Sequence, residues 1–193
     1  MTAPSPHPAI PSATVLLVRD APRFEVLMVR RHHQIEFASG ALVFPGGKVE
    51  PDDRHPGWRE ACFGADELTE DERALRICAV REAFEESGIL LARHAADAEW
   101  AIGPRAAAGR ERVAKGELAF RSLVIELGLR LDLAAMTLFA HWITPRAMRK
   151  RFDTRFYLMS APADQLAACD GFETVDAEWV APNEALRLGE AGL

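Results

Sequence analysis

The stretch from Thr69 to Gly88 constrains the fold most, because it carries the start, the periodicity and the end of a single helix. Thr69 and Glu72 have the spacing of a capping box, in which each side chain bonds the backbone N–H of the other residue. Gly88 stands where many helices end in a left-handed turn. Apolar residues recur at helical spacing on one face, at Ile77, Val80 and Phe84. The pattern predicts an amphipathic helix packed against a core.

The opposite face of the same helix carries three carboxylates, Glu82, Glu85 and Glu86. At about 100° per residue they fall within an arc of roughly 100°. Like charges at these spacings repel, and a hard cation such as Mg²⁺ or Mn²⁺ would relieve that repulsion through oxygen ligands. Acidic helix faces are also common as solvated surface. The glutamates alone therefore leave both interpretations open, a metal site and a solvated face.

Strands are expected on both sides of this helix along the chain. Residues 13–19 and 24–31 are apolar runs joined by turn residues, and residues 41–44 run into Pro45-Gly46-Gly47. Residues 51–68 are expected to be irregular. Later segments follow in the order helix, strand, strand, strand, helix, at 105–128, 136–144, 155–160, 175–180 and from Pro182 onward. This alternation predicts an α/β fold with a mixed sheet and helices on its faces.

Composition narrows the class of protein further. The 193 residues suit one domain, and the prolines of residues 1–12 predict a disordered lead-in to a single domain at 13–193. A net charge of -6 argues against nucleic acid as a partner. No apolar run approaches the ~18 residues of a membrane span, so no membrane association is expected. Three cysteines without a CxxC pair favour neither a zinc site nor disulfides, which predicts a cytoplasmic location.

A glycine loop precedes the helix, in the segment Phe44-Pro45-Gly46-Gly47-Lys48-Val49-Glu50-Pro51-Asp52-Asp53. A glycine pair lets backbone approach a metal or a phosphate closely. Loop and helix together resemble the Nudix box, G-x5-E-x7-R-E-U-x-E-E-x-G-U with U aliphatic. Gly47 matches its first glycine, and Arg81-Glu82-Ala83-Phe84-Glu85-Glu86-Ser87-Gly88-Ile89 matches its second half. Asp53 replaces the first Glu, Ala83 replaces a larger aliphatic residue, and residues 54–80 replace the short spacer, with an insertion at 54–72.

A box split by such an insertion is similar to a branch of the Nudix family that includes coenzyme A diphosphatases. Segment 37–47 resembles that branch as well, and so does segment 142–145 followed by 151–156. The resemblance implies a Nudix-type α/β/α sandwich that hydrolyses the diphosphate linkage of a nucleotide-like small molecule, with coenzyme A or acyl-coenzyme A as the leading substrate. It also implies Mg²⁺ or Mn²⁺ as cofactor and a monomer or homodimer.

Two other functions stay open. The wider family's coenzyme A motif has a serine and an arginine where this chain has His32 and Glu36, and a lost arginine weakens phosphate binding. An ADP-ribose or NADH diphosphatase is therefore the alternative substrate class. The alternative from another class is a catalytically inactive Nudix-fold module that binds or regulates.

The resemblance also assigns roles to individual residues. The metal ligands would be Glu82, Glu85 and Glu86, with the Gly46 carbonyl as a further ligand. Arg81 would hold the loop through Asp53, whereas a surface ion pair is its alternative interpretation. The general base would be Glu173, and Glu178 is the second candidate.

Substrate phosphates need cations, and basic residues gather at the end of the second strand and near the turn 145–151. The candidates for substrate binding are Gly47, Arg30, Arg31, Arg151 and Arg155. A basic turn is commonly just solvated, yet in a chain of net charge -6 it can also attract anions. The tryptophans Trp100, Trp142 and Trp179 are expected in the core.

Overall fold

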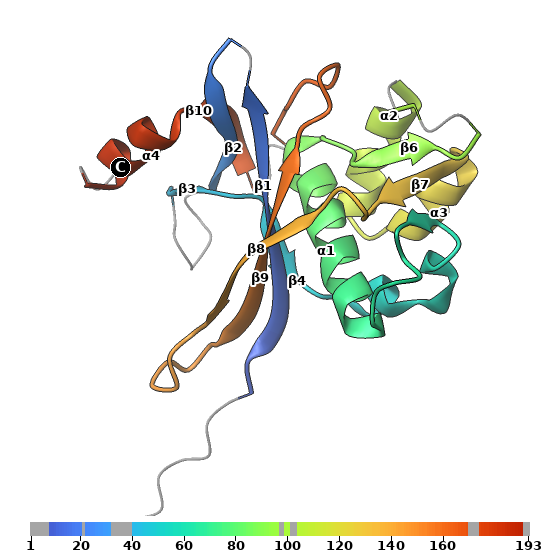
Figure 1. Ribbon diagram of the computed structural model, residues 1–193, viewed down its shortest axis with the longest axis horizontal. Coiled ribbons are helices and arrows are strands. Elements are labelled where there is room, and N and C mark those ends of the chain that lie inside the picture. The colour runs from blue at the N-terminus through green and yellow to red at the C-terminus, as the bar shows by residue number, and fades with distance from the viewer. Residues whose placement is uncertain are drawn as a thin grey trace, which may run out of the picture.

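The computed structural model describes residues 8–20, 22–31, 40–96, 99–100, 104–169 and 174–190. It contains the expected α/β architecture with a mixed sheet (Figure 1). The larger sheet is formed by β1 (Ile10–Asp20), β2 (Phe24–Arg31), β3 (Leu42–Val43), β4 (Gly46–Lys48), β8 (Thr137–Ile143), β9 (Phe152–Ser160) and β10 (Thr174–Val180). Its order is β10-β2-β1-β9-β8, with β3 beside β2 and β4 beside β1. Strands β1 and β9 run parallel, whereas the other neighbours are antiparallel.

The predicted helix is α1 (Glu70–Ser87), and both of its predicted ends are confirmed. Thr69 and Glu72 form the capping box, and Gly88 ends the helix with φ 74°. One face of α1 packs on the alternate residues of β1 that point to the same side of the sheet, Ala13, Val15 and Leu17. The predicted apolar face of α1 belongs to the same buried cluster.

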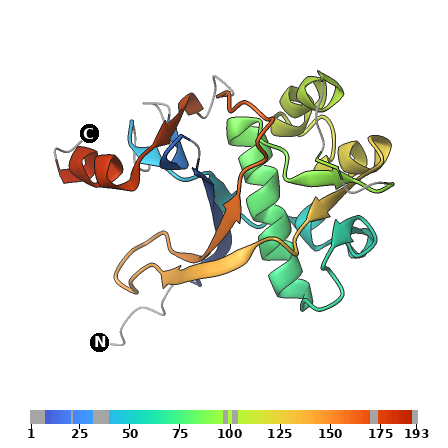
Figure 2. The ribbon, with the colours of Figure 1, turned by 45° about the horizontal axis from the view of Figure 1, so that its top comes forward.

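A second layer covers the side of α1 that faces away from the sheet (Figure 2). It contains a three-stranded sheet of β5 (Cys62–Phe63), β7 (Leu129–Asp132) and β6 (Ala92–His94), together with α2 (Pro104–Ala114) and α3 (Phe120–Glu126). The last helix, α4 (Pro182–Glu190), lies on the other side of the larger sheet, where Ala185 packs against Val26, Met28 and Val180. Because helices lie on both faces of the sheet, the fold is an α/β/α sandwich.

Several boundaries differ from expectation. Strand β1 begins at Ile10, so residues 10–12 of the expected lead-in 1–12 are strand, held by pairing of Ile10 with Phe152 and of Ser12 with Lys48. The expected helix 105–128 is divided between α2 and α3, and Gly116 has a positive φ of 69° between them. Residues 1–7 lie outside the described part of the chain.

The segment expected to be irregular, 51–68, is folded into the core. It forms the 3-10 turns η1 (Pro51–Arg54) and η2 (Pro56–Trp58) and the strand β5. Trp58 is fully buried, its indole Nε1 donates to the Asp52 carbonyl at 2.8 Å, and its ring lies 5.7 Å from that of Phe120. The insertion at 54–72 therefore helps build the layer that covers α1.

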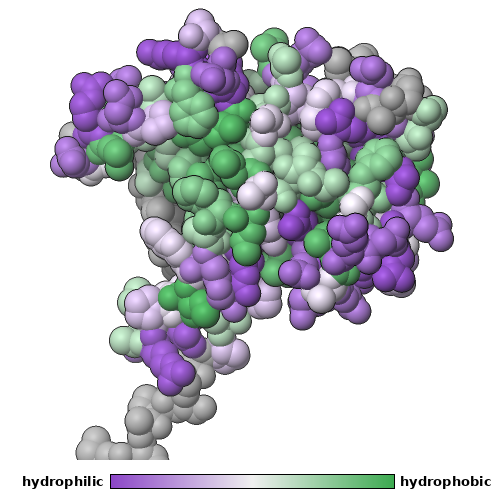
Figure 3. All heavy atoms as spheres, viewed as in Figure 1, coloured by the Kyte–Doolittle hydropathy of each residue, from purple (hydrophilic) through white to green (hydrophobic). Residues whose placement is uncertain are grey.

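Strands β8 and β9 form a hairpin that projects from the body of the molecule (Figures 1 and 2). The prediction that Trp142 lies in the core is wrong, because its strand lies at the edge of the sheet and its side chain is 70% exposed. The large exposed apolar residues of this hairpin are Leu138, Phe139, Trp142, Ile143 and Met148. Figure 3 shows hydrophobic and hydrophilic residues side by side on it. Among the helices of the described residues, none combines the length and apolar character needed to cross a membrane.

Candidate active site

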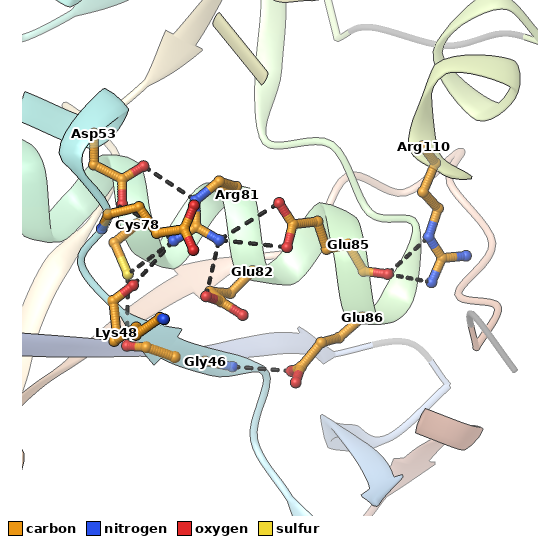
Figure 4. Close-up of polar contacts among 11 residues, drawn as sticks. Gly46, Lys48, Asp53, Cys78, Arg81, Glu82, Glu85, Glu86 and Arg110 are labelled. Carbon is orange, nitrogen blue, oxygen red and sulfur yellow. Dashed lines mark hydrogen bonds and ion pairs between the residues drawn. The ribbon is translucent and has the colours of Figure 1, made fainter. Parts of the chain in front are cut away.

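The contact between Arg81 and Asp53 that the sequence predicted is present and buried (Figure 4). Arg81 Nε and Nη2 each donate to a different oxygen of the Asp53 carboxylate, both at 3.1 Å. Arg81 Nη2 also donates to the Lys48 carbonyl at 3.0 Å. The two side chains are only 7% and 2% exposed, which excludes the alternative of a surface ion pair. The pair ties η1 and the end of β4 to the middle of α1.

The same guanidinium also contacts two of the glutamates. Arg81 Nη1 donates to Glu82 Oε1 at 2.9 Å and to the Glu85 oxygens at 3.4 and 3.3 Å (Figure 4). Glu82 and Glu85 are 12% and 19% exposed. Arg81 therefore supplies a positive charge that both carboxylates share, and it limits their orientations.

Glu86 turns toward the glycine loop. Its Oε2 accepts a hydrogen bond from the Gly46 backbone N–H at 3.0 Å, and the residue is 4% exposed. With Glu86 buried and Glu82 and Glu85 mostly buried, the alternative of a solvated acidic face is excluded. All three glutamates project from one side of α1 toward β4 and Arg81 (Figure 4).

Both glycines of the loop are needed for close packing. A Cβ at Gly47 would lie 2.2 Å from Glu82 Oε1, and a Cβ at Gly46 would lie 2.6 Å from the Ala13 carbonyl oxygen. Glycine was expected here because backbone must approach another group closely. In the structure the groups approached are a carboxylate of α1 and the neighbouring strand β1.

Burial and neighbouring charges shift the pKa values of the side chains in this cluster. Desolvation raises the pKa of Glu85 to about 7; the charge of Glu82 adds to the rise and Arg81 opposes it. Burial also raises the pKa of Asp53, against the opposing effect of Arg81. For Arg81, burial disfavours the charge, but hydrogen bonding to Asp53 and the nearby carboxylates outweigh it and raise its pKa. For Glu85, desolvation thus outweighs the compensation that Arg81 provides.

The donor set fits a hard divalent cation in its chemistry, since carboxylates from adjacent helical turns carry charge that burial opposes. The side chains are not gathered around one point, however. Among the described residues, no group of three or more His, Cys, Asp or Glu side chains is arranged to hold a metal ion. Glu82 and Glu85 lie against Arg81 and Glu86 lies against Gly46, so metal binding would require these carboxylates to turn.

The C-terminal end of α1 is anchored by contacts that no sequence pattern predicted. The Glu85 carbonyl accepts from Arg110 of α2, the Glu86 carbonyl accepts from Thr174 Oγ1 of β10, and the Ser87 carbonyl accepts from the Ala168 N–H. Each of these contacts links residues far apart in the sequence through a main-chain carbonyl, which no residue pattern marks.

Three of the predicted substrate-binding arginines, Arg30, Arg151 and Arg155, make their described contacts outside this cluster. Arg30 pairs with Glu178, the second candidate base, at 3.6 Å and lies on the sheet face opposite α1. Arg155 pairs with Asp153, and its charge acts on Glu72 in the first turn of α1, far from Glu85. Arg151 Nε donates to the Thr144 carbonyl at 3.0 Å within the hairpin.

Two predicted residues fall outside what the structure describes. They are Glu173 and the side chain of Arg31. The residue after Glu173 is described: Thr174 is fully buried and bonds the carbonyl of Glu86 at 2.9 Å. The chain therefore reaches the carboxylate end of α1 directly after Glu173.

Known proteins resemble this chain in sequence and in fold. The model of the NUDT19 Nudix domain matches residues 64–191, and that of the NUDIX domain matches residues 8–113. The chain is 30% identical to the human acyl-coenzyme A diphosphatase NUDT19 and 28% identical to the Xenopus laevis protein of that name, over 84% of this chain and 54% of each relative. It thus spans about half the length of these relatives. A NUDIX hydrolase from Alicyclobacillus acidocaldarius superposes with a TM-score of 0.83 at 29% identity, covering 96% of this chain and 84% of that one.

Proposed function

We propose, from the premise that this chain belongs to the Nudix family and carries its NUDT19 Nudix domain, that it is a divalent-metal-dependent diphosphatase of coenzyme A or acyl-coenzyme A. The observation that carries the proposal is the buried Arg81–Asp53 pair, which fixes the glycine loop against the helix of the three glutamates. A binding module without catalysis would have no need to keep all three carboxylates in this costly buried setting.

In this proposal each residue has a defined task. Glu82, Glu85 and Glu86 would hold Mg²⁺ or Mn²⁺, with the Gly46 carbonyl as a further ligand. The bound metal would neutralise the diphosphate and lower the pKa of a water molecule that attacks phosphorus. Arg81 keeps Glu82 and Glu85 on one side of α1, and the Gly46 N–H keeps Glu86 against β4.

Glu173 is the proposed general base. Support comes from its chain neighbour Thr174, whose hydroxyl bonds the carbonyl of Glu86, a proposed metal ligand. A base must come within hydrogen-bond reach of the water it activates, and this link brings the chain to the correct end of α1. Glu178 is the second candidate, although it pairs with Arg30.

The substrate is assigned from the relatives that are named acyl-coenzyme A diphosphatase. Its phosphates would meet Gly47 of the loop. The cationic side chains of Arg30, Arg31, Arg151 and Arg155 would contribute positive charge at longer range, because Arg30 lies on the sheet face opposite α1 and Arg151 and Arg155 lie in the hairpin. The departures at His32 and Glu36 favour ADP-ribose or NADH as the second candidate class, because a coenzyme A motif would place an arginine at the Glu36 position. A cytoplasmic monomer or homodimer completes the proposal.

The test is a substrate panel with product identification. The purified chain is incubated with Mg²⁺ or with Mn²⁺ and with coenzyme A, an acyl-coenzyme A, ADP-ribose or NADH, and the products are identified by mass. Release of an adenosine bisphosphate and a phosphopantetheine product is expected. Cleavage of ADP-ribose or NADH alone would keep the chemistry and replace the substrate. Metal binding without hydrolysis of any compound would favour the non-catalytic module.

A further inference from the structure

Arg110 of α2 contacts the main chain of the glutamate helix near its C-terminal end, and Glu85 lies between Arg110 and Arg81 along the helix (Figure 4). Its Nε and Nη2 both donate to the Glu85 carbonyl oxygen, at 3.0 and 2.8 Å. Its Nη1 donates to the Cys169 carbonyl at 3.4 Å. One guanidinium thus joins α2, the last turn of α1 and the segment that leads toward Glu173.

The position of this contact in the helix explains its value. The last carbonyls of a helix have no partner within the helix, and they carry the negative end of the helix dipole. At the end of α1, the Glu86 and Ser87 carbonyls take neutral donors, a hydroxyl and a backbone N–H. The Glu85 carbonyl takes a cation with two donors, so the backbone of Glu85 is held more strongly.

One glycine makes room for this guanidinium, and a second lets its helix pack closely on α3. A Cβ at Gly88 would lie 3.1 Å from Arg110 Nη1. A Cβ at Gly109 would lie 2.6 Å from Leu123 Cδ1, so Gly109 lets α2 pack closely on α3. A glycine inside a helix costs about 1 kcal/mol relative to alanine, and at Gly109 this close approach accounts for it.

We propose that Arg110 is a positioning residue of the diphosphatase site. It fixes the main chain of Glu85, so that the carboxylate leaves the helix at one defined place, and it ties that turn to the Cys169 carbonyl. The inference rests on the proposed function and adds to it a residue outside the Nudix box. A guanidinium is required because a lysine ammonium cannot place two donors on one carbonyl while a third reaches Cys169.

The consequence for catalysis follows from geometry. Residues that orient metal ligands without touching the metal typically change metal affinity or activity by about 10- to 100-fold when they are lost. Arg110 contacts neither the substrate nor the reacting atoms in this proposal. Its loss is therefore expected to lower kcat and the affinity for Mn²⁺ while KM changes little.

The test compares Arg110→Ala and Arg110→Lys with Arg112→Ala, an exposed arginine two positions further along α2. Mn²⁺ affinity is measured calorimetrically without substrate, kcat and KM are measured on the best substrate of the panel, and melting is followed by circular dichroism. We expect Arg110→Ala to lose about 10- to 100-fold in kcat and in Mn²⁺ affinity, with KM within about twofold. Arg110→Lys is expected to have kcat and Mn²⁺ affinity between those of Arg110→Ala and the wild type, and Arg112→Ala is expected to match the wild type.

A purely structural role would lower the melting temperature of Arg110→Ala and leave kcat and Mn²⁺ affinity of the folded protein unchanged, and that result would overturn the inference. If Arg110→Ala does not fold, Arg110→Lys decides: wild-type kcat and Mn²⁺ affinity in that variant would overturn it equally. Failure of the proposed function is distinct, because then the wild type itself cleaves no diphosphate. The Mn²⁺ titration would still report whether Arg110 orients Glu85.

Discussion

The acidic end of α1 and the basic hairpin β8–β9 are both dense charge clusters in the sequence, but the fold treats them in opposite ways. The glutamates of α1 are largely buried and bonded to Arg81 and to the loop, and Arg81 itself is 7% exposed. The hairpin turn keeps Arg146, Arg149 and Lys150 exposed beside apolar residues. The acidic cluster therefore carries a large desolvation cost that the hairpin does not.

The difference in burial distinguishes charges held in one orientation by hydrogen bonds from exposed charges that only contribute to the local electrostatic potential. Exposed charges are screened by salt, and their pairs contribute about 0 to 1 kcal/mol. Breaking a buried pair leaves an uncompensated charge and costs several times more. We therefore expect substitutions at the end of α1 to have large and specific effects, and substitutions in the hairpin to have small and salt-dependent ones.

The largest effect is expected for turnover in Glu85→Gln. The amide keeps the size of the side chain and removes the charge that would hold the metal, so we expect kcat to fall about 10³-fold, equivalent to about 4 kcal/mol. The measurement is steady-state hydrolysis with Mn²⁺. Glu70→Gln, in the exposed first turn of the same helix, is the matched control and should keep wild-type turnover. If Glu85→Gln keeps wild-type turnover, the assignment of the α1 carboxylates to the catalytic site is wrong.

Much of the fold could be predicted from local patterns. Strands β1 and β2 and the two ends of α1 follow from apolar runs, turn residues and caps that lie close together in the sequence. The short strands β5 and β6 were missed, because two or three residues carry no periodicity and their pairing with β7 depends on chain segments far away. The burial of Trp58 inside the insertion was missed for the same reason.

The candidate site divides in a similar way. The carboxylate face and the glycine loop were readable, because a fixed spacing of polar residues and glycines marks them, and the Arg81–Asp53 contact was predicted from the resemblance to the Nudix box. The anchors Arg110 and Thr174 were not readable, because they act on main-chain carbonyls and any residue can supply those. The assignment of Arg155 to substrate binding stays a prediction, and its pairing with Asp153 places it in the hairpin.

A second prediction compares an ion pair from each region. Asp53→Ala removes the carboxylate that accepts from Nε and Nη2 of the buried Arg81 guanidinium, so we expect the free energy of unfolding to fall by about 3 kcal/mol. Asp153→Ala removes the partner of Arg155 in the hairpin, where both side chains are about a third exposed, and should cost under ~1 kcal/mol. Urea denaturation of both variants is the measurement. Equal losses would mean that burial does not distinguish the two pairs.

A third prediction concerns the metal-free protein, in which loss of a charge at the end of α1 is expected to raise the free energy of unfolding. Folding raises the pKa of Glu85 from 4.5 to about 7, so the folded state disfavours the ionised form. The penalty is absent below pH 4.5, grows between pH 4.5 and 7 and is complete above pH 7. In the presence of a chelator, Glu85→Gln should therefore be more stable than the wild type by about 3 kcal/mol at pH 8.5 and nearly equal to it at pH 4.

Urea denaturation at the two pH values measures that difference, and Glu70→Gln is again the control. Saturating Mn²⁺ should reverse the order at pH 8.5, because only the wild type binds the ion strongly in its folded state. A variant that is less stable than the wild type at pH 8.5 in the chelator would show that contacts of Glu85 with Arg81 outweigh its desolvation.

The smallest effect is expected from the hairpin. The double variant Arg146→Ala, Arg149→Ala removes two exposed positive charges, and the anionic substrate should then be attracted less strongly at low salt. We expect KM to rise about threefold at roughly 20 mM salt, with kcat unchanged, and the difference to vanish near 0.3 M salt, where the Debye length is well below 10 Å. Steady-state kinetics across that salt range is the measurement. A 100-fold loss of kcat/KM that does not depend on salt would instead mean that the hairpin contacts the substrate directly. The hairpin and the acidic end of α1 would then form one site.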